Sequence, residues 1–318
     1  MQAVRNVAAL LVVTVLAALP RGPAVVAAPA DGLPSGALAA REDGSPPGFT
    51  GSTDIRPYWR QNLFRRIWFD QRPLVVSWWP AELARPQFSG TLGFTTFVAL
   101  TSDWGDTGGL DVRIERSIHD ACGSGCTSAG NALTTLGNWP VLAAGMGIAW
   151  WAGERAGNER LAEASSLGLE ALATTGLWNE ALKQLTARAR PPGGSLGSFW
   201  NYGKPPPGQE VGSFPSGHAQ IAFTVAAVYA TVYRDRPWVA WLAYGSASAI
   251  SLGRVALGRH FPSDVIVGGM LGASIGRFTV ARARGEPNAG HALRLVQGWR
   301  PAVDPGRGIY ALSWARSW

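Results

Sequence analysis

Apolar side chains have helical spacing through much of the second half of the chain. The clearest case follows Pro215, where one face of a helix would carry a set of apolar residues: Ile221, Ala222, Val225, Ala226, Val228 and Tyr229. Apolar runs occupy four ranges: 139–152, 219–233, 237–253 and 265–276. Glycines recur every fourth residue at Gly268, Gly272 and Gly276, a spacing that suits close helix packing. These patterns predict a group of packed helices.

The rest of the chain has a different pattern. Residues 62–110 mix aromatics with short apolar runs, which favours short strands or irregular structure. The tail alternates from Leu293 to Val296, turns at Pro305-Gly306 and alternates again to Trp314, as a hairpin does. We predict the following division: a signal peptide at 1–28, a flexible linker at 29–60, an N-terminal extension at 61–115, a catalytic helical domain at 116–282 and a tail at 283–318.

Two cations lie seven residues apart before a pair of prolines. Lys183 and Arg190 are separated by about two helical turns, so on a helix they share a face, whereas Arg188 falls on another. Pro191 is expected to end this helix, because its ring disfavours helical geometry before it. A solvated basic helix end is the ordinary explanation. However, the chain has only one other lysine, Lys204, so a compact ammonium here suggests a specific requirement.

A loop turns into a helix at Pro215-Ser216-Gly217-His218. Ser216 suits the N-cap position, and Gly217 lets the backbone approach a ligand closely. Free N–H groups at a helix start bind anions, and His218 in the first turn would direct a proton donor at such an anion. The ordinary alternative is a serine cap followed by an unrelated histidine.

A third stretch places Arg254 six residues before His260 and Asp264 four residues after it. Pro262 and Ser263 suggest another helix start. A carboxylate there can accept a hydrogen bond from one imidazole nitrogen, which leaves the other nitrogen free to attack. A His–Asp pair at a helix cap is the structural alternative. The three stretches are weak signals singly and a specific one together.

Together the stretches resemble the signature of the type 2 phosphatidic acid phosphatase (PAP2) superfamily, which includes bacterial class A acid phosphatases and vanadium haloperoxidases. The family pattern is K-x6-RP, PSGH and SR-x5-H-x3-D, and the resemblance covers roughly residues 116–282. The chain departs at Gly253, where the family usually has serine. That change removes a hydroxyl and one orienting hydrogen bond, although a glycine amide can still approach a phosphate.

The resemblance implies an all-α fold, a helical bundle of the PAP2/chloroperoxidase-like type with small β-hairpin or irregular elements from the two extensions. It also implies that His260 forms a phosphohistidine, Asp264 orients His260, and His218 protonates the leaving alcohol. The implied phosphate ligands are Lys183, Arg190, Ser216, Gly217 and Arg254. No metal or other cofactor is required. Since His260 must be neutral and His218 protonated, we expect a bell-shaped pH profile on the acidic to neutral side.

The leading hypothesis is a metal-independent phosphatase for phosphomonoesters or lipid (pyro)phosphates. One alternative is a vanadate-dependent haloperoxidase that uses the same pocket. Another is a non-catalytic anion-binding envelope protein. The formal charge of +7 suits anionic substrates or an anionic membrane surface, and no basic run with interleaved aromatics suggests nucleic-acid binding. The substrate's identity and the oligomeric state are left open.

The first residues have the pattern of an export signal, with Arg5 before an apolar core at 7–19 and small residues at 24–30. We therefore predict a periplasmic or extracellular location. There, Cys122 and Cys126 can form a small disulfide loop, with two free thiols as the alternative. Most apolar runs are shorter than the ~20 residues of a spanning helix. A soluble bundle is favoured, and association with a membrane remains open.

Overall fold

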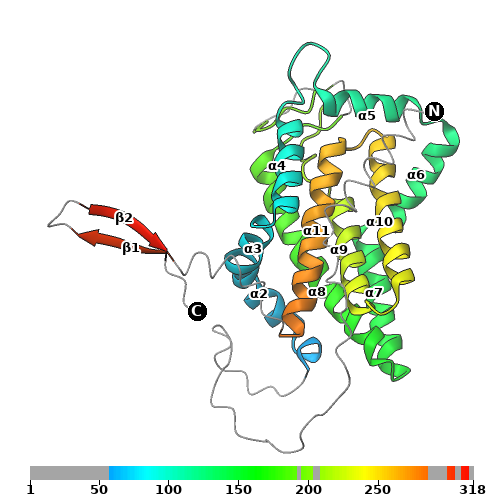
Figure 1. Ribbon diagram of the computed structural model, residues 1–318. Helices are drawn as coiled ribbons and strands as arrows, with labels where there is room; N and C mark the ends of the chain where they lie inside the picture. Colours follow the sequence, from blue (N-terminus) through cyan, green and yellow to red (C-terminus); the bar gives the residue numbers. More distant parts are fainter. Residues whose placement is uncertain (1–56, 192–194, 203–207, 286–298, 305–308, 315–318) are drawn as a thin grey trace, which may run out of the picture.

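The structure is a computed structural model that describes residues 57–191, 195–202, 208–285, 299–304 and 309–314. The predicted signal peptide at 1–28 and most of the linker at 29–60 lie outside the described residues. The described chain is almost entirely helical (Figure 1), which confirms the all-α fold class. The packed part consists of long helices with shorter N-terminal helices beside them.

The N-terminal extension is helical, so the prediction of strands or irregular structure for 62–110 is wrong. Its elements are η1 (Tyr58–Arg60), α2 (Leu63–Pro73), the π-helical turn η2 (Leu74–Trp78), α3 (Trp79–Leu83), α4 (Pro86–Leu100) and α5 (Leu110–Asp120). Pro80 and Pro86 occupy the first turns of α3 and α4, where a missing N–H costs nothing. Some of the aromatics pack on other helices, as Trp78 does on Phe278.

The second half forms six helices: α6 (Ser124–Leu136), α7 (Trp139–Arg155), α8 (Glu159–Thr186), α9 (Gly217–Val232), α10 (Pro237–Ala256) and α11 (Pro262–Ala283). The most buried of them is α11, which lies between α4 and α9 in Figure 1. One hydrophobic cluster joins α8, α9 and α11 to the N-terminal turn η2. The helices predicted from the apolar runs are therefore present.

Three glycines of α11 set its distance from α9. A Cβ at Gly272 would lie 2.0 Å from the carbonyl oxygen of Gln220, and one at Gly276 would lie 2.5 Å from that of Thr224. At Gly268 the nearest atom would be the Ser216 carbonyl oxygen at 2.7 Å. The contacts advance by four residues on both helices, so α9 and α11 run parallel and in register. Their N-termini consequently lie at the same end of the bundle.

Buried ion pairs attach the N-terminal helices to the bundle. Glu82 of α3 pairs with Arg277 of α11 at 3.1 Å. Arg66 of α2 pairs with Glu170 of α8 at 3.0 Å, and both side chains are almost fully buried. A buried charge is tolerated only when it has a partner, so these pairs fix where the extension docks.

Two smaller predictions concern the cysteines and the tail. Cys122 and Cys126 form a disulfide, as predicted. In the tail, β1 (Trp299–Asp304) pairs antiparallel with β2 (Ile309–Trp314), with Trp299 opposite Trp314. The hairpin is therefore present, but its first strand begins after the predicted alternation at 293–296, which lies outside the described residues.

One helix of the described part is long and apolar enough to cross a membrane. It is α11, and 83% of its most apolar window is buried inside the protein. The core helix of a bundle has the same properties, so this helix gives little information about a membrane.

The glycine contacts predict the effect of a single methyl group. Gly272→Ala should lower the free energy of unfolding by about 1–3 kcal/mol, because its Cβ meets backbone that cannot move independently. Gly245→Ala, in α10, is the matched control, since its Cβ would meet no atom within 4 Å. That change should be neutral or stabilise by up to about 1 kcal/mol. Thermal or denaturant unfolding measures both, and equal stability of the two variants would contradict the packing.

Candidate active site

The first two cations, Lys183 and Arg190, come from two different elements, whereas the sequence predicted one helix. Helix α8 ends at Thr186 with Ala187 in a left-handed conformation, before the prolines are reached. Arg190 therefore lies in an extended segment, where its neighbour Ala189 forms a β-bridge with Val211. Lys183 remains on the helix. The two cations reach the same site from different elements, not from one helical face.

The loop before α9 places an unpaired hydroxyl in the site. Ser216 occupies the N-cap position as predicted, but its side chain makes no cap hydrogen bond. Its hydroxyl is fully buried and has no partner, although buried polar atoms are nearly always hydrogen-bonded. A Cβ on Gly217 would lie 3.4 Å from Nζ of Lys183. The glycine thus lets the ammonium approach the N-terminus of α9, where His218 is in the first turn.

The end of α10 supplies the third cation. Arg254 is buried, and its Nη1 donates to the hydroxyl of Thr134 at 3.2 Å, while its buried Nε has no partner. Gly253 faces elsewhere, because a Cβ there would lie 3.5 Å from Gly130 of α6. The Cβ of a serine at this position would point toward α6. Glycine in place of the family's serine therefore leaves the contacts of Arg254 unchanged.

His260 is held by a backbone carbonyl more closely than by Asp264. Its Nδ1 lies 2.9 Å from the carbonyl oxygen of Ser213 and 3.5 Å from Oδ2 of Asp264. Asp264 accepts a hydrogen bond from the Ser213 hydroxyl at 2.6 Å and from the Phe261 N–H at 2.9 Å. With Nδ1 donating to a carbonyl, the imidazole carries its lone pair on Nε2. That nitrogen is the one available to attack.

Ser213, Arg188 and Asp111 are functional candidates that the sequence reasoning missed. Arg188 was set aside because a helix would have turned it away, yet it is fully buried beside Asp264. Ser213 precedes the Pro215-Ser216-Gly217-His218 stretch without any motif of its own. Asp111 lies on α5, far from the three stretches in sequence. Proximity to the motifs was the available signal for Ser213 and Arg188, and no signal pointed to Asp111.

The three cations act on one another and on His218. Burial and then the neighbouring Arg190 and Arg254 lower the pKa of Lys183. Burial, followed by Arg190 and Arg259, lowers the pKa of Arg254 to about 10. Cations that depress one another's pKa form a site that favours an anion, because a bound negative charge relieves both desolvation and repulsion.

Both histidines are neutral at pH 7 in this structure. Burial, then the charges of Arg254, His260, Lys183 and Arg190, lower the pKa of His218 to about 4. Burial also lowers the pKa of His260 to about 4, although Asp264 acts in the opposite direction. Neutral His260 fits a nucleophile. The pKa of His218 thus lies below the ordinary ~6.5 on which the expected pH profile was based, because three cations surround it.

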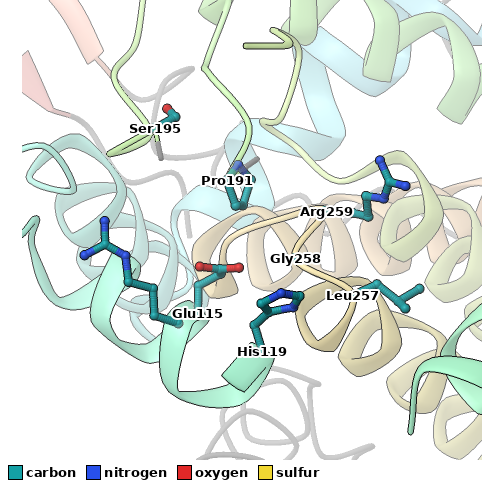
Figure 2. A pocket seen from close by; sticks show the side chains of 8 residues that line it. Glu115, His119, Pro191, Ser195, Leu257, Gly258 and Arg259 are labelled. Atoms are coloured by element: carbon teal, nitrogen blue, oxygen red, sulfur yellow. The ribbon is translucent and has the colours of Figure 1, made fainter. Parts of the chain in front are cut away.

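A cavity of about 400 Å³ opens beside the site (Figure 2). It lies between α5 and the loop that joins α10 to α11, and Glu115, His119 and Arg259 contribute polar side chains. Burial raises the pKa of Glu115 to about 7. Pro191, next to Arg190, is also part of the wall, so the cavity lies along the cationic segment.

The arrangement offers a group of buried and partly buried cations, a free imidazole nitrogen and a second imidazole whose pKa the cations lower. Such a site can hold a phosphoryl group, form a covalent bond to it and move a proton. Within the described residues, no group of three or more histidine, cysteine or acidic side chains could hold a metal ion.

Comparisons with known proteins give one family match and one curated relative. The sequence model of the PAP2 superfamily matches residues 167–285. A lipid A 1-phosphatase of Porphyromonas gingivalis is 36% identical over 72 residues, which are 22% of this chain and 16% of that protein's length. The chain therefore spans about a sixth of that curated relative.

Two solved structures are similar. One is LpxE of Aquifex aeolicus, with a TM-score of 0.45 and 22% identity over 57% of this chain and 98% of that one. The other is a transmembrane PAP2-type phosphatidylglycerolphosphate phosphatase of Bacillus subtilis, with a TM-score of 0.44 and 21% identity over 62% of this chain and 96% of that one.

The histidine environments predict a titration that anions change. In phosphate-free buffer, both His218 and His260 should titrate near pH 4, well below the ordinary ~6.5. Adding inorganic phosphate should raise the pKa of His218 by at least about one unit, because the anion offsets the surrounding cations. Imidazole NMR, assigned with His218→Asn and His260→Asn, measures both values. A His218 that titrates near 6.5 without phosphate, or ignores it, would contradict this electrostatic picture.

Proposed function

We propose that the chain is a metal-independent phosphatase of the PAP2 superfamily, whose sequence model matches residues 167–285, and that it acts on lipid-linked phosphate esters. One observation carries the proposal. Buried Arg254 and partly buried Lys183 and Arg190 surround His218, beside a neutral His260 whose Nε2 is left free by the contact of Nδ1 with the Ser213 carbonyl. Phosphoryl transfer depends mainly on positioning and charge stabilisation, which this arrangement supplies from side chains alone.

The first step transfers the phosphoryl group to His260. Nε2 attacks phosphorus, the ester P–O bond breaks, and the departing oxygen takes a proton from His218. Lys183, Arg190 and Arg254, with the free Ser216 hydroxyl, hold the non-bridging oxygens. Because His218 is neutral in the empty site, the proton arrives with the substrate, whose monoanion persists up to a second pKa of about 6.

The second step releases phosphate. Water attacks the phosphohistidine, the P–N bond breaks, and neutral His218 takes a proton from the attacking water. The reverse use of one residue, first as acid and then as base, follows the general logic of two-step transfer. Phosphate leaves and His260 returns to its neutral form, held by the Ser213 carbonyl.

The substrate class follows from the surface of the protein. Large apolar side chains are exposed on four helices of the described part: Phe64, Trp68 and Phe69 on α2, Phe94 and Phe97 on α4, Ile148 and Trp151 on α7, and Trp238, Trp241 and Leu242 on α10. Exposed apolar surface on this scale is typical of an interaction site, and lipid is a partner that suits aromatic and aliphatic side chains. The similarity to a lipid A 1-phosphatase supports the same substrate class.

The roles of the two histidines predict different dependence on the leaving group. His260→Ala should lower phosphate release on the order of 10³-fold or more for every ester, since no other nucleophile replaces it. His218→Asn should lower turnover of an alkyl phosphate strongly but retain the first turnover of 4-nitrophenyl phosphate, whose leaving group needs no proton.

Phosphate and nitrophenol release with a chelator present would measure both effects. The panel contains diacylglycerol phosphate, a prenyl pyrophosphate and soluble esters, all in detergent micelles. Wild-type protein that releases no phosphate from any of them, or a fully active His260→Ala variant, would contradict the proposed function. A preference for soluble esters would contradict only its lipid part.

The exposed aromatics predict how the protein partitions. After expression it should sediment with membranes, resist alkaline carbonate and dissolve in detergent, because apolar contacts persist at high pH. Trp238→Ser, Trp241→Ser and Leu242→Ser in combination should release part of it, whereas Arg234→Ser should not. Turnover of 4-nitrophenyl phosphate in detergent verifies that each variant is folded. A wild-type protein found entirely in the soluble fraction would contradict the membrane contact.

A further inference from the structure

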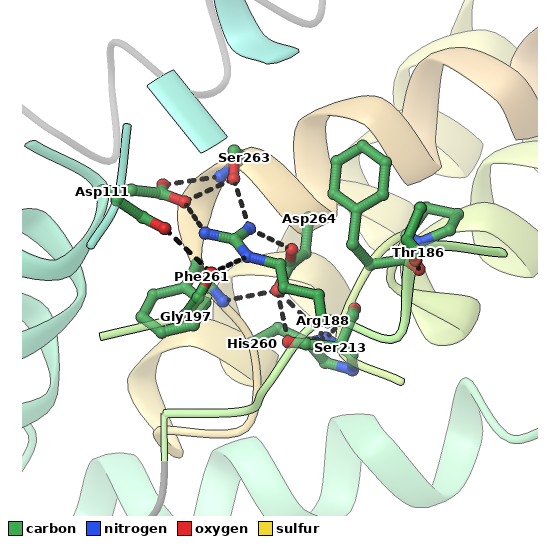
Figure 3. A network of polar contacts seen from close by, with 12 residues as sticks. Asp111, Thr186, Arg188, Gly197, Ser213, His260, Phe261, Ser263 and Asp264 are labelled. Carbon is green, nitrogen blue, oxygen red and sulfur yellow. Dashed lines mark hydrogen bonds and ion pairs between the residues drawn. The ribbon is translucent and has the colours of Figure 1, made fainter. Parts of the chain in front are cut away.

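Arg188 occupies the centre of a buried polar network beside the site (Figure 3). Its side chain is fully buried, with one guanidinium nitrogen bonded to Asp264 and another 2.7 Å from Oδ2 of Asp111. Both carboxylates are themselves almost inaccessible to solvent. A cation that bridges two buried carboxylates is costly to assemble and has one geometry, so its presence here calls for a reason beyond packing.

The guanidinium is fixed on every side. Nε donates to the carbonyl oxygen of Gly197 at 3.1 Å, and Nη1 also donates to the hydroxyl of Ser263 at 2.8 Å. Its flat faces are covered by Phe261 at 4.4 Å and Phe199 at 4.9 Å. The planar fork therefore holds a single orientation, which a lysine could not reproduce.

Asp264 and Ser213 connect Arg188 to the imidazole of His260 by hydrogen bonds. While Oδ1 binds Arg188, Oδ2 accepts the Ser213 hydroxyl at 2.6 Å. The Ser213 carbonyl accepts Nδ1–H of His260 at 2.9 Å, and the Ser213 N–H donates to the Arg188 carbonyl at 3.0 Å. Ser213 is consequently held by both the side chain of Asp264 and the backbone of Arg188. A displacement of Arg188 would change the direction of the His260 ring.

Arg188 lowers the pKa of both carboxylates, but the net shifts of the two differ. Burial by itself raises the pKa of Asp264, yet the adjacent guanidinium brings it down to about 2. For Asp111, burial prevails and the pKa is raised. Asp111 instead accepts the Ser263 N–H at 3.0 Å, in the first turn of α11. It anchors the other end of the guanidinium to the helix that begins at the site.

We propose that Arg188 is a positioning residue: by joining Asp111 to Asp264, it fixes Ser213 and turns Nε2 of His260 toward the phosphoryl group. Arg188 touches neither substrate nor reacting atoms. The inference rests on the proposed phosphatase function for its kinetic readout. It differs from a merely structural role, in which the same residue would only fasten α5 to α11.

The two roles are separated by comparing variants at both ends of the bridge. Arg188→Met should lower kcat by about a hundredfold with KM changed less than about threefold, because a misdirected nucleophile affects chemistry and not binding. The acidic limb of kcat/KM should move up by at least about one pH unit, since Asp264 loses its counter-charge. Arg188→Lys keeps the positive charge but loses the planar guanidinium, so its kcat should fall about tenfold. The acidic limb of its kcat/KM profile should stay within about half a pH unit of wild type.

Asp111→Asn is the matched control, because it breaks the same α5 contact and leaves the charge beside Asp264. It should lower kcat less than about tenfold, with the acidic limb unchanged. If Asp111→Asn and Arg188→Met lose activity equally and neither moves the limb, Arg188 is structural and the proposal is overturned. Should Arg188→Met fail to fold, Arg188→Lys decides alone, and a kcat within about twofold of wild type overturns the proposal.

A readout without turnover keeps this test separate from the proposed function. Nitrogen NMR of the His260 ring should show the proton on Nδ1 in the wild-type protein and in Asp111→Asn. In Arg188→Met it should show a mixture of tautomers. If the wild-type protein hydrolyses no ester but the tautomer still follows Arg188, the proposed function fails and the positioning role stands. An unchanged tautomer in folded Arg188→Met refutes the positioning role.

Discussion

The close parallel contact between α9 and α11 is the constraint on which the site depends. Because three glycines of α11 leave no room for side chains against the α9 backbone, the start of α9 is held beside the second turn of α11. The Ser216 N–H donates to the Asp264 carbonyl at 3.0 Å, which ties the two starts directly. Two helix N-termini, with their positive dipole ends, are thereby directed at one place. His218, the proposed proton donor, is in α9, and His260, the proposed nucleophile, precedes α11 by two residues.

This placement brings several positive charges close together at the candidate site. Buried cations repel one another there, and both histidines are driven to the neutral form. The exception is Asp264, which stays ionised because Arg188 is beside it. In the proposed reaction, a phosphate ester relieves this repulsion when it binds and brings a proton with it. The repulsion between the cations would thereby favour substrate binding and couple it to the protonation that the proposed chemistry needs.

Sequence reasoning could find the residues whose type and spacing express their chemistry. His218, His260 and the three cations are such residues. The spacing of glycines at every fourth residue of α11 likewise predicted its close packing. It could not find Asp111, because a single carboxylate on an amphipathic helix gives no sign of a partner 77 residues away. It misplaced Arg188 because it extended α8 as far as Pro191. In the structure the helix ends at Thr186, and Ala187 takes a left-handed conformation. The N-terminal helices were missed because their apolar runs are short and their buried ion pairs are tertiary.

The same geometry explains why an exposed apolar surface is compatible with a charged site. Arg254 is near the end of α10, whereas the exposed Trp238 and Trp241 are in its first turns. At about 1.5 Å per residue, more than ten residues of helix separate the apolar end from the charged one. A lipid phosphate has the same division, with its charge at one end and its chains running away from it. A bundle that keeps its cations at the helix ends and its aromatics along the helices can therefore bind the headgroup without extracting the chains from the membrane.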